Sequence, residues 1–194
     1  MPLVPAFRRR LAPRTALVLL ALAAAPGAAQ SPPHHAADAT FMRGMVGHHA
    51  QAVLMTSLVM DRTDNAALRL LAERITVSQT DEIAWMERWL KDRKEPLPDP
   101  HAHHQPGHTA MAGMLTDAQL AELTAARGGR FDRLFLQFMI QHHEGALVMV
   151  ADLKAVPGAG QEPATAMFAS EVDSDQRMEI ARMRAMLKAT PDRE

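Results

Sequence analysis

Cysteine and tyrosine are both absent from the 194 residues, and aromatic residues make up only 4% of the chain. Without cysteine, disulfides, zinc–thiolate sites and thiol catalysis are excluded. The net charge is -1, and no basic stripe interleaved with aromatic residues is present, so nucleic acid is not expected as a partner. A glycine-rich phosphate loop and a nucleophile elbow are also missing, which leaves no evident catalytic machinery.

Residues 1–29 have the pattern of a cleaved export signal. Arg8, Arg9, Arg10 and Arg14 precede an apolar run over residues 16–25, and small residues follow it. We expect cleavage after Ala29, a flexible N-terminus over residues 30–37 and a mature protein in the periplasm or outside the cell. The apolar run is short for a membrane span, so no stable span is expected after cleavage; an uncleaved anchor is the alternative.

An internal repeat dominates the rest of the chain. A first block recurs 94 residues later and a second block 97 residues later. In the first block, Phe41, Met45, His48, His49, Ala52 and Met55 match Phe135, Met139, His142, His143, Ala146 and Met149. In the second, Ala72, Gln79, Glu82, Ile83, Ala84, Met86 and Leu90 match Ala169, Gln176, Glu179, Ile180, Ala181, Met183 and Leu187.

Both blocks have apolar residues at alternating spacings of four and three, which predicts helices. Each half therefore forms a helical hairpin, over residues 38–92 and 130–189. Two such hairpins bury their apolar faces against each other, so we expect one all-α domain over residues 38–190, an up-and-down four-helix bundle. The connection over residues 93–129 is expected to be extended and mobile, except for a short helix from Thr116 to Arg127 that Gly128 and Gly129 end.

Counting residues along each hairpin places a polar layer inside the bundle. Its expected members are His48, His142, Gln79, Gln176, Glu82, Glu179, Met45 and Met139. Buried polar groups without partners cost about 1–3 kcal/mol each, so the layer is either a structural hydrogen-bond network or a metal site. His49 and His143 are rotated by about 100° from their neighbours and either contact the adjacent helix or face outward. Met55 and Met149 are read mainly as core residues.

A second candidate site lies in the central connection. His101, His103, His104, His108, Met111 and Met114 follow one another in a tract that offers no core to fill, as in an arm that captures soft metal ions; the alternative is a solvated linker. Thioether and imidazole ligands favour Cu(I) and its analogue Ag(I), whereas imidazole and carboxylate also suit Cu(II) or zinc. The Glu-x-x-His motifs of di-iron bundles are not in the required places.

The stretches "MAGMLTDAQL", "GGRFDRLFLQFMIQHHEGALVMV" and "EVDSDQRMEIARMRAML" resemble the DUF305 family of exported bacterial proteins. The resemblance implies a ferritin-like bundle and periplasmic copper binding or tolerance. It also implies a ligand set of Met45, His48, His49, Met55, Met139, His142, His143 and Met149. The chain departs from the family pattern at Gly47 and Gln141, where the family usually has proline or a similar residue.

Three functions remain open at this point. The first is a periplasmic protein that binds copper for sequestration, tolerance or delivery, with silver as a further ion. The second is a ferritin-like redox enzyme that uses a bound metal, and the third is a structural or partner-binding bundle. The oligomeric state is open, and a homodimer or a metal-handling protein is a candidate partner.

Overall fold

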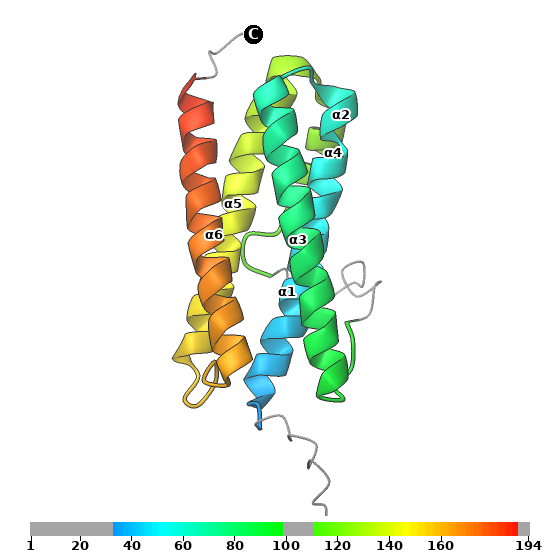
Figure 1. Cartoon of the computed structure of the whole chain (residues 1–194). Coiled ribbons are helices and arrows are strands. Elements are labelled where there is room, and N and C mark those ends of the chain that lie inside the picture. The colour runs from blue at the N-terminus through cyan, green and yellow to red at the C-terminus, as the bar shows by residue number, and fades with distance from the viewer. Residues whose placement is uncertain (1–32, 99–110, 190–194) are drawn as a thin grey trace, which may run out of the picture. The chain divides into compact units, whose positions relative to one another are not determined.

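The computed structural model describes residues 33–98 and 111–189, and every regular element in these ranges is a helix. Two helices are short: α2 (Val59–Arg62) follows α1 after a break at Leu58, and α4 (Asp117–Ala125) lies in the connection. The four long helices are α1 (Ala36–Ser57), α3 (Ala66–Asp92), α5 (Gly128–Ala155) and α6 (Pro163–Ala189). The predicted all-α fold is confirmed (Figure 1).

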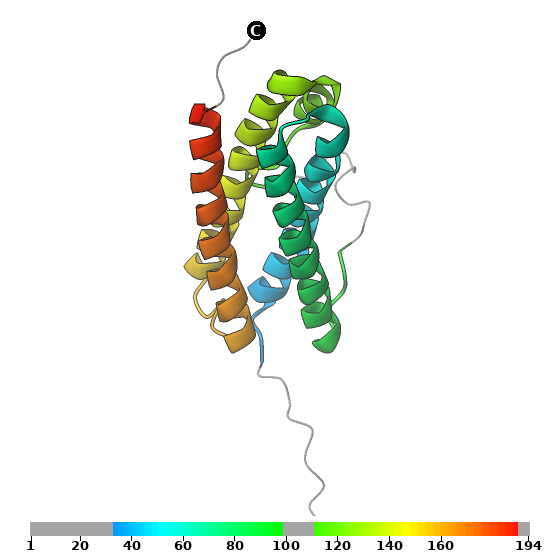
Figure 2. The same ribbon diagram turned by 45° about the horizontal axis from the view of Figure 1, so that its top comes forward.

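The long helices form two antiparallel hairpins. Helix α1 packs along α3, and α5 packs along α6. The hairpins meet mainly through α1 and α5, which contact each other directly and lie side by side in both views (Figures 1 and 2). This is the up-and-down bundle expected from the repeat, and it brings the two His-His sequences onto neighbouring helices.

Local chemistry explains where the helices begin. The Asn65 side chain accepts hydrogen bonds from the backbone N–H groups of Ala67 and Leu68, which caps α3. Thr116 caps α4 in the predicted capping box, and Pro163 occupies the first position of α6. One boundary was wrong: α4 ends at Ala125, and Gly128 does not terminate it but begins α5. The extended backbone at Ala126 and Arg127 separates the two helices.

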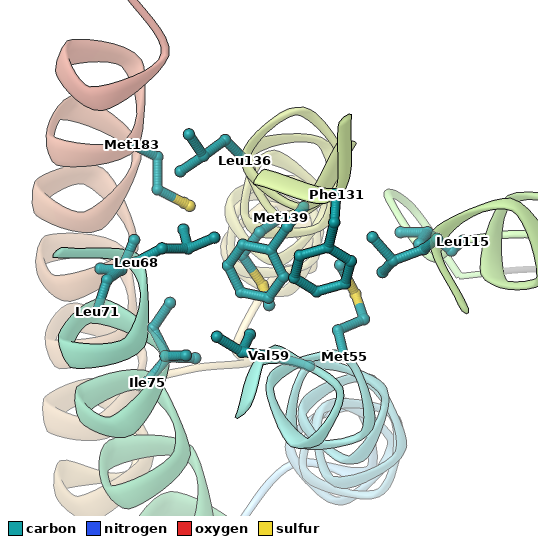
Figure 3. Packing of buried hydrophobic residues seen from close by; sticks show 14 of the residues in the cluster. Met55, Val59, Leu68, Leu71, Ile75, Leu115, Phe131, Leu136, Met139 and Met183 are labelled. Atoms are coloured by element: carbon teal, nitrogen blue, oxygen red, sulfur yellow. The ribbon is translucent and has the colours of Figure 1, made fainter. Parts of the chain in front are cut away.

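The hydrophobic core is divided into two clusters. One contains Met45, Phe41 and Ala146, and the other contains Met55, Phe135 and Met139. Figure 3 shows part of the second cluster, where labelled side chains from the four long helices and from Leu115 converge. Along both α1 and α5, the histidine pair lies between residues of one cluster and residues of the other. A polar layer therefore interrupts the core at mid-height.

Several predicted features lie outside the described residues. These are the export signal over residues 1–29 with its cleavage after Ala29, and His101, His103, His104 and His108. Within residues 33–98 and 111–189, no helix is long and apolar enough to cross a membrane.

Helix α1 begins at Ala36, where the His35 ring accepts a hydrogen bond from the backbone N–H of Ala37.

Candidate metal centre

The imidazole rings of His48 and His142 meet at the contact between α1 and α5. Their centroids are 3.8 Å apart, with an angle of 36° between the ring planes. Both side chains are completely buried. The sequence repeat predicted that these two histidines share one height in the bundle, and the structure brings them into direct contact.

Hydrogen bonds define which nitrogen of each ring carries a proton. The Nε2 atom of His48 lies 3.1 Å from the backbone oxygen of Ala112, and Nε2 of His142 lies 2.9 Å from the backbone oxygen of His48. A carbonyl oxygen can only accept, so Nε2 donates in both rings. In neutral imidazoles the Nδ1 atoms then hold free lone pairs. Neither Nδ1 has a hydrogen-bond partner within the described part of the chain.

Burial keeps both rings neutral. Desolvation and the neighbouring His49 lower the pKa of His48 from 6.5 to about 3, although the bond to Ala112 opposes this shift. Desolvation, followed by the nearby His48, lowers the pKa of His142 well below its usual value. Protons therefore do not compete for the two Nδ1 lone pairs near neutral pH, which is the state that metal ligation requires.

The second histidine of each pair contacts the adjacent helix rather than facing outward. The Nε2 atom of His49 donates to a carboxylate oxygen of Glu82 on α3 at 2.5 Å. The same arrangement in the second half joins His143 and Glu179 of α6 at 2.6 Å. Both rings are buried, and their Nδ1 atoms also lack a partner among the described residues. A carboxylate bound to one ring nitrogen is the usual support for a histidine that ligates metal through the other.

The direction of the Glu82 side chain places its carboxylate away from the level expected from the sequence. Residue counting placed Glu82 one turn beyond Gln79, level with Met45. The Glu82 carboxylate instead approaches Ser78, whose hydroxyl donates to it at 3.4 Å, and so reaches His49. Helical side chains point toward the N-terminus, and this direction accounts for the difference.

The two glutamines of the layer add further buried polar atoms. Gln79 and Gln176 are almost completely buried. Both polar side-chain atoms of Gln79, and the Oε1 atom of Gln176, lack hydrogen-bond partners within the described ranges. Because native proteins satisfy most buried polar groups, these imidazole and amide atoms need further partners, which can be ordered water or an ion. Of these atoms, the imidazole nitrogens are of the type that ligates copper or zinc, and an amide can offer only its oxygen.

The predicted methionine ligands occupy three different environments. Met45, Met55 and Met139 are completely buried in the core clusters. Met149 is partly buried and packs against the cluster that contains Met45. Met111 and Met114 are also partly buried. No group of three or more histidine and acidic side chains within the described residues has the geometry to hold an ion. A complete coordination shell would therefore need a methionine, an amide or a movement of the rings.

Residues 111–115, hereafter the strap, pack against the bundle, whereas the sequence predicted that the tract containing Met111 and Met114 has no core to fill. The strap packs against both α1 and α5. Gln51 donates to the backbone oxygen of Leu115 at 3.1 Å and accepts from its N–H at 2.7 Å. The Gln141 side chain donates to the oxygen of Gly113 at 3.3 Å. Leu115 is itself a core residue, so this part of the connection is fixed to the bundle.

The close approach between the strap and α5 requires glycine. A Cβ atom on Gly145 would lie 2.0 Å from the oxygen of Ala112, and one on Gly113 would lie 2.5 Å from the oxygen of Gln141. Sequence reasoning did not identify the roles of Gln51, Gly145 and Gln141. The only available signal was a glycine and two glutamines beside the histidine pairs.

A model of the family described as a domain of unknown function, DUF305, matches residues 38–187. Among solved structures, the chain is similar to a candidate secreted DUF305 protein from Streptomyces coelicolor, with 32% identity and a TM-score of 0.68; the match covers 79% of this chain and 93% of that one. It is also similar to CopM in its Cu(I)-bound and Cu(II)-bound forms. Identity to CopM is 27%, with TM-scores of 0.62 and 0.64, over 78% of this chain and 96% of CopM.

A curated relative matches over a shorter region. Protein L153 of Acanthamoeba polyphaga mimivirus, described as uncharacterized, is 35% identical over 57 residues. The match spans 29% of this chain and 38% of that protein, well under two thirds of its length.

Proposed function

The chain belongs to the DUF305 family, and from that membership together with the buried histidine layer we propose that it binds copper outside the cytoplasm, for sequestration, tolerance or delivery. The observation that carries this proposal is the set of four buried Nδ1 atoms without partners, on His48, His49, His142 and His143. Each belongs to a ring whose Nε2 is already hydrogen-bonded. The layer therefore offers nitrogen lone pairs to an ion and already holds the supporting bonds.

Similarity to CopM favours copper among the ions that such ligands accept. CopM has copper-bound forms with Cu(I) and with Cu(II), and it shares this bundle at 27% identity. The ligand types agree, because neutral imidazole suits both oxidation states of copper and thioether sulfur favours the reduced one. Export to the periplasm, inferred from the pattern of residues 1–29, would place the protein where it can intercept copper before the ion enters the cytoplasm.

The decisive experiment compares copper binding by the purified protein with binding by a His48→Ala/His142→Ala variant. We expect the wild-type protein to bind copper and to melt at a higher temperature when copper is present, since an ion that binds only the folded state stabilises it. At a free copper concentration of 100 times Kd, the gain is about 2.7 kcal/mol. The double variant should lose both the bound copper and the thermal shift.

Two further variants control this experiment. His34 bonds to Glu95 outside the histidine layer, so His34→Ala should retain full copper binding. A Glu82→Gln/Glu179→Gln variant keeps all four rings but weakens their support, and we expect copper affinity to fall about 10–100-fold if His49 and His143 are ligands. Equal copper content in the wild-type protein and in a folded His48→Ala/His142→Ala variant would rule out a site in this layer.

A further inference from the structure

The histidine layer reaches solvent through its two glutamates. The rings of His49 and His143 are completely buried. The carboxylates that accept their hydrogen bonds, Glu82 and Glu179, belong to side chains that are 16% and 20% exposed. The other members of the layer are at most 2% exposed, and the strap covers His48 on the side of α1 and α5. A solute that approaches the layer from solvent therefore meets carboxylates first.

A third carboxylate, Asp175, joins the two glutamates. It lies on α6 one helical turn before Glu179, so the two share one face of that helix. Desolvation and the negative charges of Glu82 and Glu179 raise the pKa of Asp175, so the three carboxylates are close neighbours. Helices α3 and α6 contact each other far less than either contacts its hairpin partner. The three carboxylates therefore lie along the less closely packed side of the bundle.

The repeat shows that the fold does not require a carboxylate at position 175. At the offset of 97, Asp175 corresponds to Ser78 on α3. Ser78 donates a hydrogen bond to Glu82 at 3.4 Å, whereas Asp175 adds a like charge one turn from Glu179, an arrangement that destabilises a helix. Within the described part of the chain, Asp175 forms no ion pair that would offset this repulsion. A charge that opposes stability, and that the other half of the repeat omits, points to a role beyond the fold.

We propose that Glu82, Asp175 and Glu179, hereafter the acidic rim, are the entrance through which a metal cation reaches the buried imidazoles, and that Asp175 sets the rate of entry. The inference rests on the proposed function, because it assumes that an ion binds the histidine layer. The rim attracts the ion and does not hold it, since no group of three or more histidine and acidic side chains among the described residues is arranged to bind a metal. Charges of one sign at an entrance raise the local concentration of the oppositely charged solute and its association rate.

Gln79 and Gln176 continue the polar path from the rim toward the rings. They lie one helical turn before Glu82 and Glu179, on the same helix faces. Both are almost completely buried, and their Oε1 atoms have no partner among the residues that the structure describes. Each amide offers oxygen lone pairs to a cation that has passed the rim. The negative charge is thus concentrated where the ion arrives, and the interior of the layer offers neutral groups.

Stopped-flow mixing of the full protein with Cu(II) at low ionic strength tests the entrance. Cu(II) quenches tryptophan fluorescence, and Trp85 and Trp89 are the only two tryptophans of the chain, so quenching follows binding. The phase that reports the histidine layer is the one that the His48→Ala/His142→Ala variant lacks. We expect Asp175→Ser to lower the second-order rate constant of this phase by about two- to tenfold. The difference should disappear in about 1 M salt, where the Debye length is about 3 Å.

Two further variants separate position from net charge. Asp152→Ser removes one negative charge from an exposed position of α5, about 15 Å along the helix from His142, and should leave the rate constant unchanged. Ser78→Asp adds a carboxylate at the position equivalent to Asp175 and should raise the rate constant severalfold. The urea midpoint of Asp175→Ser should match or exceed that of the wild-type protein, because the substitution removes a repulsion between like charges. Slower binding by that variant is then an effect on entry and not on folding.

The results distinguish failure of the entrance from failure of the metal site. Absence of the histidine-dependent phase from the wild-type protein would overturn the proposed function and the entrance together. If the phase is present but Asp175→Ser binds Cu(II) as fast as the wild-type protein at low ionic strength, only the entrance is overturned. The same conclusion follows if Asp152→Ser slows binding equally, or if the effect of Asp175→Ser persists in about 1 M salt.

Discussion

Replacing Gly145 by alanine tests whether the strap is held to the bundle as the structure describes. A Cβ at this position would lie 2.0 Å from the oxygen of Ala112, 2.4 Å from its carbonyl carbon and 2.6 Å from the Cα of Gly113. All three are backbone atoms, so no side-chain rotation can relieve the clash. The strap must move away from α5, and its hydrogen bonds to α1 must lengthen or break.

The loss of free energy follows from the bonds that hold the strap. Releasing Ala112 leaves the buried Nε2–H of His48 without an acceptor, which costs about 1–3 kcal/mol. The two bonds between Gln51 and Leu115 contribute about 1 kcal/mol each. Alanine is better than glycine within a helix by about 1 kcal/mol, which offsets part of this loss. We therefore expect Gly145→Ala to lower the free energy of unfolding by about 2–4 kcal/mol.

Urea denaturation followed by circular dichroism measures this change. Gly129 provides the matched control, since it also lies on α5 but a Cβ there would have no atom within 4 Å. Gly129→Ala should leave stability unchanged or raise it slightly. Amide hydrogen exchange should become faster at residues 112–115 in Gly145→Ala alone. If Gly145→Ala were as stable as Gly129→Ala, the strap would not be packed against α5 and the reasoning about His48 would fail with it.

Two further predictions concern pH and helix capping. Because the pKa of His48 falls from 6.5 to about 3 on folding, the unfolded chain binds an extra proton between these values, and stability should decrease as the pH drops below 6.5. This group contributes a slope of up to about 1.4 kcal/mol per pH unit, so urea midpoints of His48→Phe should vary less steeply with pH; an unchanged slope would contradict a neutral buried ring. Asn65→Ala removes the cap of α3 and the 2.8 Å bond to the buried Asp132, for an expected loss of about 2–4 kcal/mol in denaturation experiments. Asn65→Asp keeps the cap but places a negative charge against Asp132, so full stability in that variant would show that the bond between the two side chains is unimportant.

The helices were predictable because local signals and the repeat agree. Asn65, Thr116 and Pro163 carry start signals that depend only on nearby residues. The repeated spacing then placed His48 and His142 on facing helices. The strap was not predictable, because its position depends on Gly113 and Gly145 approaching across the fold, and a His- and Pro-rich tract favours an extended linker when read locally.

The second histidine of each pair illustrates the same limit. Their rotation along the helix left two orientations open for His49 and His143. Only the packing of the hairpins decides between them, since it brings Glu82 and Glu179 within reach. Likewise, core methionines and metal-binding methionines have the same spacing along a helix, so the sequence cannot distinguish between them.

His48 and His142 are equivalent in the repeat, but the strap gives them different hydrogen-bond acceptors. At the repeat offset of 94, Gln51 corresponds to Gly145, yet one holds the strap by hydrogen bonds and the other by allowing close contact. As a result, His48 donates to a segment outside the helices, whereas His142 donates to the backbone of α1. The two histidines that the repeat relates therefore depend on different parts of the chain for their hydrogen bonds.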